Sequence, residues 1–197
     1  MEDFDVNGVG QGNTTYNEND TENHGDSDYR PGTGVDLYKK ATGVIVGYNQ
    51  AGEWLEYTVK VAKTGTYTMS ASVASANNTS GFKFSMDGKD ITEEMAVPQA
   101  TTGEDNYDEY NVVKADVELT EGEHILRITV TGDWMDIDYI EFVEPGSSEP
   151  GPGTDAIRPA MPAVRSDVSA PRLVKKGNTL FVEKNGMRFD LTGHRLR

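Results

Sequence analysis

The segment Trp54-Leu-Glu-Tyr-Thr-Val-Lys-Val61 decides the fold class, because its apolar and polar residues alternate with a period of two. The apolar side chains at positions 55, 57, 59 and 61 fall on one face of an extended chain, and the polar side chains at positions 56, 58 and 60 fall on the other. A strand with one buried and one exposed face has this pattern. The segment therefore predicts a β-strand that covers a hydrophobic core.

The same alternation recurs along the chain on the C-terminal side of this strand. In Thr66–Val73, Tyr, Met, Ala and Val alternate with Thr and Ser, which predicts a second strand that forms a hairpin with the first by turning near Gly65. Turns are expected at Asp87-Gly88 and Glu121-Gly122. Further strands are predicted at 81–86, 110–119, 124–130 and 137–143. Because no comparable helical stripe separates them, the pattern favours an antiparallel β-sandwich over an α/β fold.

The first 45 residues have a different composition, polar and rich in Gly, Asn and Asp. They are too long to be a simple connection, and we expect a long surface loop between two edge strands. These edge strands are predicted near Glu2–Val6 and Val35–Tyr38.

Composition excludes several classes of protein. The 197 residues include 33 acidic and 18 basic side chains, a formal charge of −15, which argues against general nucleic-acid binding because phosphate contacts need clustered Lys and Arg. The absence of cysteine excludes disulfides, thiolate metal sites and cysteine nucleophiles. No apolar run reaches the roughly 18 residues of a membrane span, and Met1–Asp5 has no signal-peptide character. We expect any export signal to lie outside this chain.

The charge is divided unequally along the chain. Residues 1–155 carry 9 basic and 30 acidic side chains, whereas residues 156–197 carry 9 basic and 3 acidic ones. Between them, a segment rich in Pro, Gly, Ser and acid cannot bury apolar surface and predicts an exposed linker. We therefore predict a sandwich domain at 1–143, a linker at 144–157 and a basic segment at 158–197. Asn185-Gly186 predicts a hairpin turn in the basic segment, with a flexible arm as the alternative.

Residues suited to catalysis are scattered. The three histidines stand at 24, 124 and 194, and no Gly-x-Ser-x-Gly elbow occurs. Paired carboxylates can hydrolyse glycosidic bonds, but a domain with 30 acids always offers such a pair, and a solvated acidic surface also explains them. We predict no catalytic residue. A small glycan-active enzyme that uses two loop carboxylates remains the alternative.

A hard cation suits the acidic residues better than zinc does, because calcium takes carboxylate and carbonyl oxygens from irregular loops. Candidate ligands are Glu2, residues 17–28, Asp136 and Asp138. Asp136 and Asp138 alternate along a predicted strand and so share a face. Their mutual repulsion there needs a nearby cation or hydrogen-bond donor.

Three aromatic residues stand outside the core pattern. Tyr48 lies in the turn-like Gly47–Gly52, Tyr107 lies in a polar segment, and Trp134 follows Gly132-Asp133. The apolar C–H faces of sugars stack on aromatic rings, while sugar hydroxyls need amide or carboxylate partners. These rings therefore indicate a sugar-binding surface, and the alternative for each is a small satellite core beneath a loop.

Six segments between residues 46 and 142 form a recognisable series. They are Val46-Gly-Tyr-Asn-Gln-Ala-Gly-Glu-Trp-Leu-Glu-Tyr-Thr-Val59, Gly65-Thr-Tyr-Thr, Val73-Ala-Ser75, Asp87-Gly88, Gly122-Glu-His-Ile-Leu-Arg127 and Asp136-Ile-Asp-Tyr-Ile-Glu-Phe142. In order and spacing this series resembles the carbohydrate-binding modules of family 6, over about residues 1–143. The resemblance implies a β-sandwich of jelly-roll type that binds polysaccharide and catalyses no reaction.

The resemblance also implies a ligand-binding site in loops at one end of the sandwich. Tyr48 matches the tyrosine that forms one wall of the family's site, and Tyr107 occupies the place of the usual tryptophan wall. Asp136 stands where the family has a sugar-binding asparagine, and Trp134 can supply further stacking surface. The two departures are expected to alter affinity or sugar preference, because tyrosine has a smaller face and an ionised aspartate only accepts hydrogen bonds.

A structural Ca²⁺ near the amino terminus is a further implication of the resemblance. Glu2 matches one of the family's glutamate ligands, and Asp138 matches the acid that closes the last motif. The first of the family's N-terminal acidic ligands has no counterpart in this sequence. The metal would stabilise the fold by offsetting carboxylate repulsion.

The expected function is non-catalytic binding of polysaccharide, with xylan or a related β-linked plant polysaccharide as the ligand. We expect a monomeric module, bacterial and secreted or cell-surface associated, that targets an appended glycoside hydrolase or esterase to its substrate. The closing Phe189–Arg197 pattern resembles short basic modules at the C-termini of such enzymes. The basic segment can thus contact an acidic surface or a cell-surface partner, and an attachment domain that acts through this segment is a second alternative function.

Overall fold

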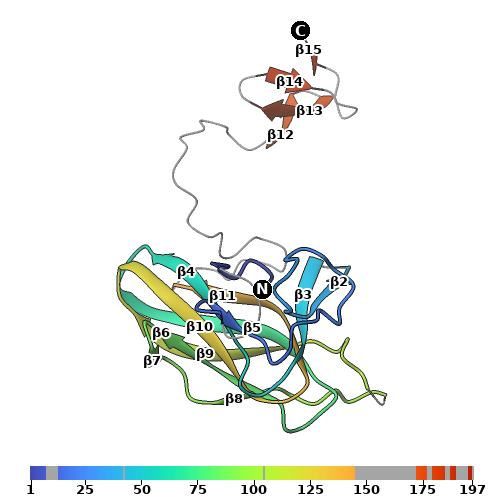
Figure 1. Ribbon diagram of the computed structural model, residues 1–197. Helices are drawn as coiled ribbons and strands as arrows, with labels where there is room; N and C mark the ends of the chain where they lie inside the picture. The colour runs from blue at the N-terminus through green and yellow to red at the C-terminus, as the bar shows by residue number, and fades with distance from the viewer. Residues whose placement is uncertain are drawn as a thin grey trace. The chain divides into compact units, whose positions relative to one another are not determined.

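The protein is all-β in the part of the chain that the computed structural model describes. These residues are 1–7, 13–41, 43–103 and 105–144, together with the backbone of four strands between residues 172 and 196. The chain forms two compact units, Met1–Ala160 and Met161–Arg197. Residues 145–157 of the predicted linker lie outside the described part. In the first unit, two antiparallel sheets form the predicted sandwich (Figure 1).

The larger sheet has six strands. Its order is β1-β4-β10-β6-β7, and β8 also pairs with β6. The bounds are β1 Tyr16–Asn17, β4 Trp54–Val61, β6 Gly81–Met86, β7 Lys89–Asp90, β8 Met95–Ala96 and β10 Gly122–Gly132. The central pair is β4 and β10, in which Tyr57 lies opposite Leu126 and Leu55 lies opposite Ile128. The apolar face of the segment that predicted the fold therefore meets its partner strand in the core.

The smaller sheet has five strands in the order β2-β3-β11-β5-β9. Their bounds are β2 Leu37–Lys40, β3 Gly43–Asn49, β5 Gly65–Ala74, β9 Asn111–Leu119 and β11 Met135–Val143. The register of β11 shifts between Ile137 and Tyr139, and this irregularity includes Asp138. The order places β3 between β2 and β11, and this neighbourhood carries the candidate site.

The core lies between the two sheets and includes most of the side chains that the period-two pattern assigned to it. Phe82, Phe84, Leu126 and Ile128 of the six-stranded sheet are almost fully buried. From the other sheet, Met69, Ala71, Val73 and Ile137 are also almost fully buried. Burial of this apolar area is the main stabilising contribution, because no disulfide is available to a chain without cysteine.

The predicted hairpin near Gly65 is wrong. The chain turns there, but β4 pairs with β1 and β10 of one sheet, whereas β5 pairs with β9 and β11 of the other. The connection therefore crosses between the layers. Alternation specifies which face of each strand is buried. Two consecutive strands can bury these faces either as neighbours in one sheet or as members of two sheets that pack against each other. The Glu121-Gly122 turn, which joins β9 to β10, crosses the layers in the same way.

The N-terminal edge strand predicted near Glu2–Val6 is also wrong. Residues 1–7 form no strand, although the Asp5 N–H donates to the Glu56 carbonyl at 2.8 Å and Phe4 is fully buried. The buried Phe4 ring and isolated hydrogen bonds hold this segment in place of a regular ladder of hydrogen bonds. The second predicted edge strand is confirmed as β2, and β3 was missed because Tyr48 and its glycines were interpreted as a turn.

The second unit contains a four-stranded antiparallel sheet of β12 Arg172–Lys176, β13 Thr179–Lys184, β14 Met187–Phe189 and β15 Arg195–Leu196. In the β13–β14 pair, Lys184 lies opposite Met187, which confirms the predicted hairpin around Asn185-Gly186. The side chains of this unit lie outside the described part, so the expected role of the basic segment stays a prediction.

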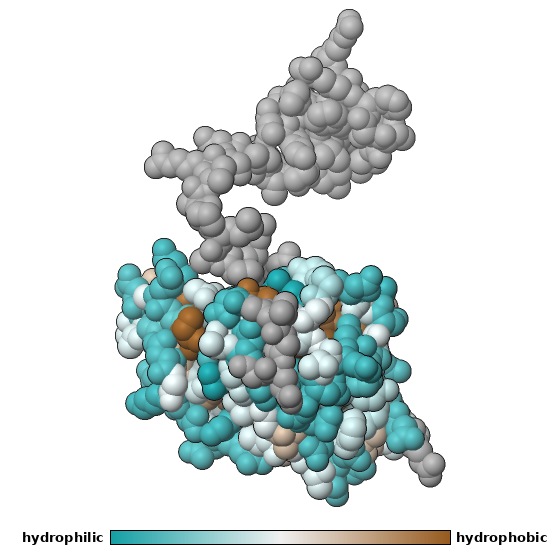
Figure 2. All heavy atoms as spheres, in the orientation of Figure 1, coloured by the Kyte–Doolittle hydropathy of each residue, from teal (hydrophilic) through white to brown (hydrophobic). Residues whose placement is uncertain are grey.

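The described surface of the first unit is largely hydrophilic in the view of Figure 2, in agreement with its acidic composition. No helix in the described residues is long and apolar enough to cross a membrane. Large exposed apolar or aromatic side chains are therefore informative. They are Val6, Tyr29, Tyr48, Val112, Ile125 and Trp134.

Candidate functional site

Tyr48 lies near the end of β3 with its side chain 48% exposed. Its φ of 52° places a bulky residue in the left-handed region, which costs on the order of 1–3 kcal/mol and persists only where the surroundings impose it. The Tyr38 ring, from β2, lies 5.3 Å from the Tyr48 ring between centroids. The Tyr48 ring thus packs against Tyr38 but remains half-exposed. Burial of the ring in the core therefore does not offset the free-energy cost of its strained backbone.

Trp134 has the same combination of features. It lies in the turn between β10 and β11, has a φ of 65° and is 42% exposed. Its ring lies 6.2 Å from that of Tyr48 with an interplanar angle of 81°. The two rings therefore form two perpendicular walls at one end of the five-stranded sheet. Two exposed, strained aromatic residues side by side indicate a function other than packing.

The turn that carries Trp134 is fixed by buried hydroxyls. The Trp134 N–H donates to the Asn49 carbonyl at 2.7 Å, and its carbonyl accepts from Ser75 Oγ at 2.6 Å and Ser80 Oγ at 3.1 Å. Both serines are buried. At Gly132 a Cβ atom would lie 1.9 Å from the Thr79 carbonyl oxygen, so only glycine fits. These contacts fix the backbone that carries the Trp134 ring.

The turn after Tyr48 is anchored to both sheets. Asn49 Nδ2 donates to the Met135 carbonyl at 2.8 Å, which attaches the end of β3 to β11. The Gly52 N–H donates to the Val130 carbonyl at 3.0 Å, and the Gln50 N–H donates to Glu53 Oε2 at 2.7 Å. The segment that looked like a free turn in the sequence is therefore held at each end.

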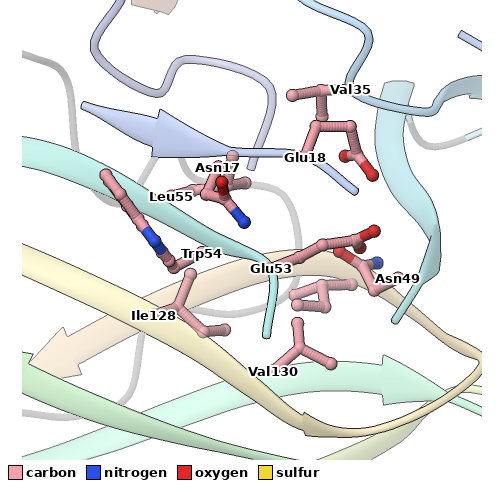
Figure 3. Close-up of a pocket in the computed structure, with 10 residues that line it drawn as sticks. Asn17, Glu18, Val35, Asn49, Glu53, Trp54, Leu55, Ile128 and Val130 are labelled. Atoms are coloured by element: carbon pink, nitrogen blue, oxygen red, sulfur yellow. The ribbon is translucent and has the colours of Figure 1, made fainter. Parts of the chain in front are cut away.

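Three buried carboxyl groups lie beneath this turn. Glu18, Glu53 and Asp36 are each less than 10% exposed. Burial, reinforced by a hydrogen bond and repulsion from Glu53, raises the pKa of Glu18 far above its usual range. Burial therefore favours the protonated form of Glu18, whose carboxyl O–H donates a hydrogen bond to Glu53. Figure 3 shows both carboxyl groups with Asn49 at one end of a small pocket, and Trp54 and Ile128 at the other.

Asp136 lies on β11, the strand next to β3, and is 7% exposed. Burial raises its pKa to about 6, against the opposing effects of Lys40 and of a hydrogen bond from the Tyr48 backbone N–H. A Cβ atom at Gly47 would come within 2.8 Å of Asp136 Oδ1 and 2.9 Å of the Tyr38 ring. Glycine at this position thus lets the carboxylate and the aromatic rings share one site.

Tyr107 and Lys40 also lie near Asp136. The Tyr107 hydroxyl accepts from Asn77 Nδ2 at 3.2 Å, and its pKa is raised by burial and by nearby groups that include Asp136 and Tyr48. Lys40 Nζ forms an ion pair with Asp108 Oδ1 at 2.6 Å. The structure therefore places the four predicted ligand-binding residues in one region, with Tyr48, Trp134 and Asp136 as its centre.

Sequence interpretation missed three residues of this region, namely His24, Tyr38 and Lys40. Their signals were weak: Tyr38 fits an ordinary edge strand, Lys40 is one of nine basic residues in the first 155, and His24 lies in a loop of acids. Only the pairing of β2 with β3 and the folding of the His24 loop bring them to Tyr48.

The predicted calcium ligands lie elsewhere. The Met1 ammonium donates to Glu2 Oε2 at 2.9 Å and to the Asp138 carbonyl at 3.2 Å, and the pKa of Asp138 is raised by burial and by Glu2. Glu2 Oε2 and the Asp138 main-chain carbonyl oxygen therefore both contact the Met1 ammonium, and oxygen atoms of these kinds are the ligands that a hard cation takes. Among the side chains described in 1–7, 13–41, 43–103 and 105–144, no group of three or more His, Asp or Glu has metal-site geometry.

Most of the first unit matches a known family. The family model for carbohydrate-binding module family 6 matches residues 27–144, which is more than half of the chain. The chain belongs to carbohydrate-binding module family 6. It is thus a carbohydrate-binding module, of a family that binds sugars without catalysis. A comparison with curated proteins gives no match.

Solved structures similar to this family 6 module include other modules of the family. A C-terminal family 6 module of the laminarinase LamC from Zobellia galactanivorans shares 20% identity with a TM-score of 0.51, over 56% of this chain and 88% of that one. A module of lichenase 5A from Cellvibrio mixtus, in complex with cellotriose, shares 22% identity with a TM-score of 0.49, over 56% and 85%. A module from Clostridium cellulolyticum, in complex with xylose, shares 22% identity with a TM-score of 0.48, over 56% and 88%.

The module's other tryptophan is in a different environment from Trp134. Trp54 begins β4 on the six-stranded sheet, and the Arg127 guanidinium lies 3.8 Å from its ring centroid. Arg127 is fixed there by two hydrogen bonds to Glu56 Oε1, at 2.8 and 2.6 Å. One face of the Trp54 ring is therefore already occupied by a cation–π contact.

Proposed function

We propose that the module binds xylan or a related β-linked plant polysaccharide at the site formed by Tyr48, Tyr107, Trp134 and Asp136. In this proposal it keeps an appended secreted glycoside hydrolase or esterase near its substrate. The observation that carries the proposal is the pair Tyr48 and Trp134, two half-exposed rings 6.2 Å apart that both adopt left-handed backbone angles. Packing alone gives no reason to maintain this strain.

The chemistry of the site suits a sugar. Tyr48 and Trp134 offer perpendicular apolar faces for the C–H groups of a pyranose ring. Asp136 offers carboxylate oxygens that accept hydrogen bonds from hydroxyls, and the Tyr107 hydroxyl can both donate and accept. Affinity for one such site is expected in the micromolar to millimolar range, because few polar contacts accompany the stacking.

The charge around the site favours neutral glycans. The acidic side chains near Tyr48, or near the residues that surround it, are Asp20, Asp108 and Asp136. The nearby cation Lys40 is already paired with Asp108. A uronate carboxylate would be repelled, since like charges at short range cost free energy even near a surface. Xylose and glucose units carry no such charge.

The test is binding of the purified chain to a panel of glycans. We expect retardation in gels that contain xylan or β-glucan, saturable isothermal titration with the matching oligosaccharides, and no retardation by polygalacturonate. No release of reducing sugar is expected. Reducing-sugar release in proportion to protein concentration would instead support the alternative of a small glycan-active enzyme, and failure to bind every neutral glycan would refute the proposal.

The module is also proposed to bind Ca²⁺ through Glu2 and Asp138, away from the sugar site. The metal would contribute positive charge between two carboxyl groups that otherwise repel each other. We expect millimolar Ca²⁺ to raise the melting temperature by about 2–6 °C, and a chelator to reverse the shift. The readout is differential scanning calorimetry.

Asp138→Asn is expected to remove the Ca²⁺-dependent shift, whereas Asp116→Asn, an exposed aspartate on β9, should leave it intact. Equal shifts in both variants, or no shift in the unaltered protein, would contradict the assignment of the ligands. Sugar binding is measured in parallel and is expected to respond to Ca²⁺ only through stability.

A further inference from the structure

A third ring, His24, lies next to Tyr48. The two ring centroids are 6.5 Å apart with an interplanar angle of 63°, close to the 6.2 Å that separates Tyr48 from Trp134. The His24 side chain is 51% exposed. His24 is therefore an accessible ring at the edge of the proposed sugar site, and neither the fold nor the family match assigns it a role.

The sheet order places His24 and Trp134 on opposite sides of Tyr48. Tyr48 belongs to β3, which lies between β2 and β11. The loop that contains His24 covers β2, because Asn23 Oδ1 accepts from the Leu37 N–H at 3.1 Å and the Ser27 N–H donates to the Leu37 carbonyl. Trp134 directly precedes β11. His24, Tyr48 and Trp134 therefore form an aromatic row across the end of three adjacent strands.

The His24 end of the aromatic row is held in position by its surroundings. The His24 N–H donates to the buried Asp36 carboxylate, and the His24 carbonyl accepts from the Tyr38 hydroxyl at 3.2 Å. At Gly25 a Cβ atom would lie 1.9 Å from the Leu37 carbonyl oxygen, so the loop approaches β2 as closely as the backbone permits. None of these contacts involves the imidazole ring itself.

The imidazole has one polar neighbour. His24 Nε2 lies 3.0 Å from Asp20 Oδ2, and the Asp20 side chain is 46% exposed. A carboxylate next to an exposed ring is also found at Tyr48 and Asp136, although Asp136 is buried and Asp20 is exposed. This combination of an apolar face and a hydroxyl acceptor is what a pyranose unit requires.

We infer that His24 and Asp20 form a second sugar subsite, which continues the Tyr48 site along the aromatic row. The separation of neighbouring rings is comparable to the length of one sugar unit in an extended β-linked chain. The ligand is thus an internal stretch of at least two neutral sugar units, with one unit over Tyr48 and Trp134 and the next over His24. This inference rests on the proposed function.

The test compares His24→Ala with His24→Phe and with the unaltered protein, by titration with xylo- or gluco-oligosaccharides of increasing length. His24→Ala is expected to lower affinity about three- to tenfold for oligosaccharides long enough to reach both subsites, and to leave affinity for the monosaccharide unchanged. His24→Phe retains a ring and should retain most of the affinity. His124→Ala is the matched control, because His124 contacts Asp87 and Thr120 at the β9–β10 turn and lies outside the aromatic row.

Each outcome decides a different claim. Unaltered affinity of His24→Ala at every length, or an equal loss at every length including the monosaccharide, would overturn the second subsite and leave the Tyr48 site standing. Failure of the unaltered protein to bind any of these glycans would overturn the proposed function together with the subsite. A loss in the His124→Ala control equal to that in His24→Ala would show that the effect is not local, and would also overturn the subsite.

Discussion

Tyr48→Gly is expected to lower glycan affinity at least ~100-fold while changing the free energy of unfolding by no more than about 1 kcal/mol. The ring at the centre of the aromatic row is lost, so stacking is lost with it. Glycine adopts a φ of 52° without strain, and this relief offsets the lost contacts of a half-exposed ring with Tyr38 and Trp134. Isothermal titration and urea unfolding of the same preparations separate the two effects.

Tyr29→Gly is the matched control for this substitution. Tyr29 is 51% exposed, donates to Asp3 Oδ1 at 2.6 Å and lies outside the aromatic row. Its replacement is expected to leave glycan affinity unchanged and to lower stability by about 0.5–1 kcal/mol, since glycine there gains conformational entropy in the unfolded chain without relieving strain. If Tyr48→Gly kept its affinity, the strained ring would have no role in binding.

Glu18→Gln is expected to make the protein more stable than the unaltered chain at pH 8–9, by about 1–3 kcal/mol. Glu18 lies in a buried cluster with Glu53 and Asp36. Burial raises the pKa of Glu18, and repulsion from these two carboxyl groups raises it further. Glutamine keeps the two hydrogen bonds of Glu18, since its carbonyl can accept from the Asn19 N–H and its amide can donate to Glu53. Glutamine cannot ionise, and so the unfolded chain no longer gains the free energy of ionisation that burial denies to Glu18 in the folded state.

The pH dependence follows from the direction of this shift. A carboxyl group whose pKa is raised in the folded state contributes stability that is fully present below its unfolded pKa and is lost as the pH rises toward the folded value. The unaltered protein should therefore lose stability between pH 5 and 9, and Glu18→Gln should lose less. Urea unfolding at pH 5, 7 and 9 measures this, with exposed Glu123→Gln as the control. A difference between Glu18→Gln and the unaltered chain that does not grow with pH would refute the protonated state of Glu18.

Much of the fold could be predicted from the sequence because burial has a period. The alternation in Trp54–Val61 and in the later strands identified their core faces correctly. It could not identify their partners, which is why the chain near Gly65 was expected to form a hairpin and instead connects the two sheets. Strand pairing depends on how whole layers stack, and local alternation carries no information about it.

The candidate site was only partly predictable for a related reason. Tyr48, Tyr107 and Trp134 stood out because rings in polar segments are unusual, and Asp136 followed from its place in the family's last motif. The backbone strain at Tyr48 and Trp134, and the approach of His24 to Tyr48, arise from tertiary contacts of Asn49, Ser75 and Asp36. No residue pattern in the loop of His24 distinguishes it from other acidic loops.

Glycan binding at the Tyr48–Trp134 end of the five-stranded sheet can be tested directly, because the chain has two tryptophans. Trp54→Phe leaves Trp134 as the single tryptophan, and Trp134→Phe leaves Trp54 beneath Arg127. Fluorescence is recorded during titration with an oligosaccharide that isothermal titration has shown to bind. We expect a saturable change in emission in the Trp54→Phe variant, with the same midpoint as isothermal titration gives. We expect no change in emission in the Trp134→Phe variant. A saturable change in Trp134→Phe with a silent Trp54→Phe variant would place the ligand on the other sheet and contradict the account.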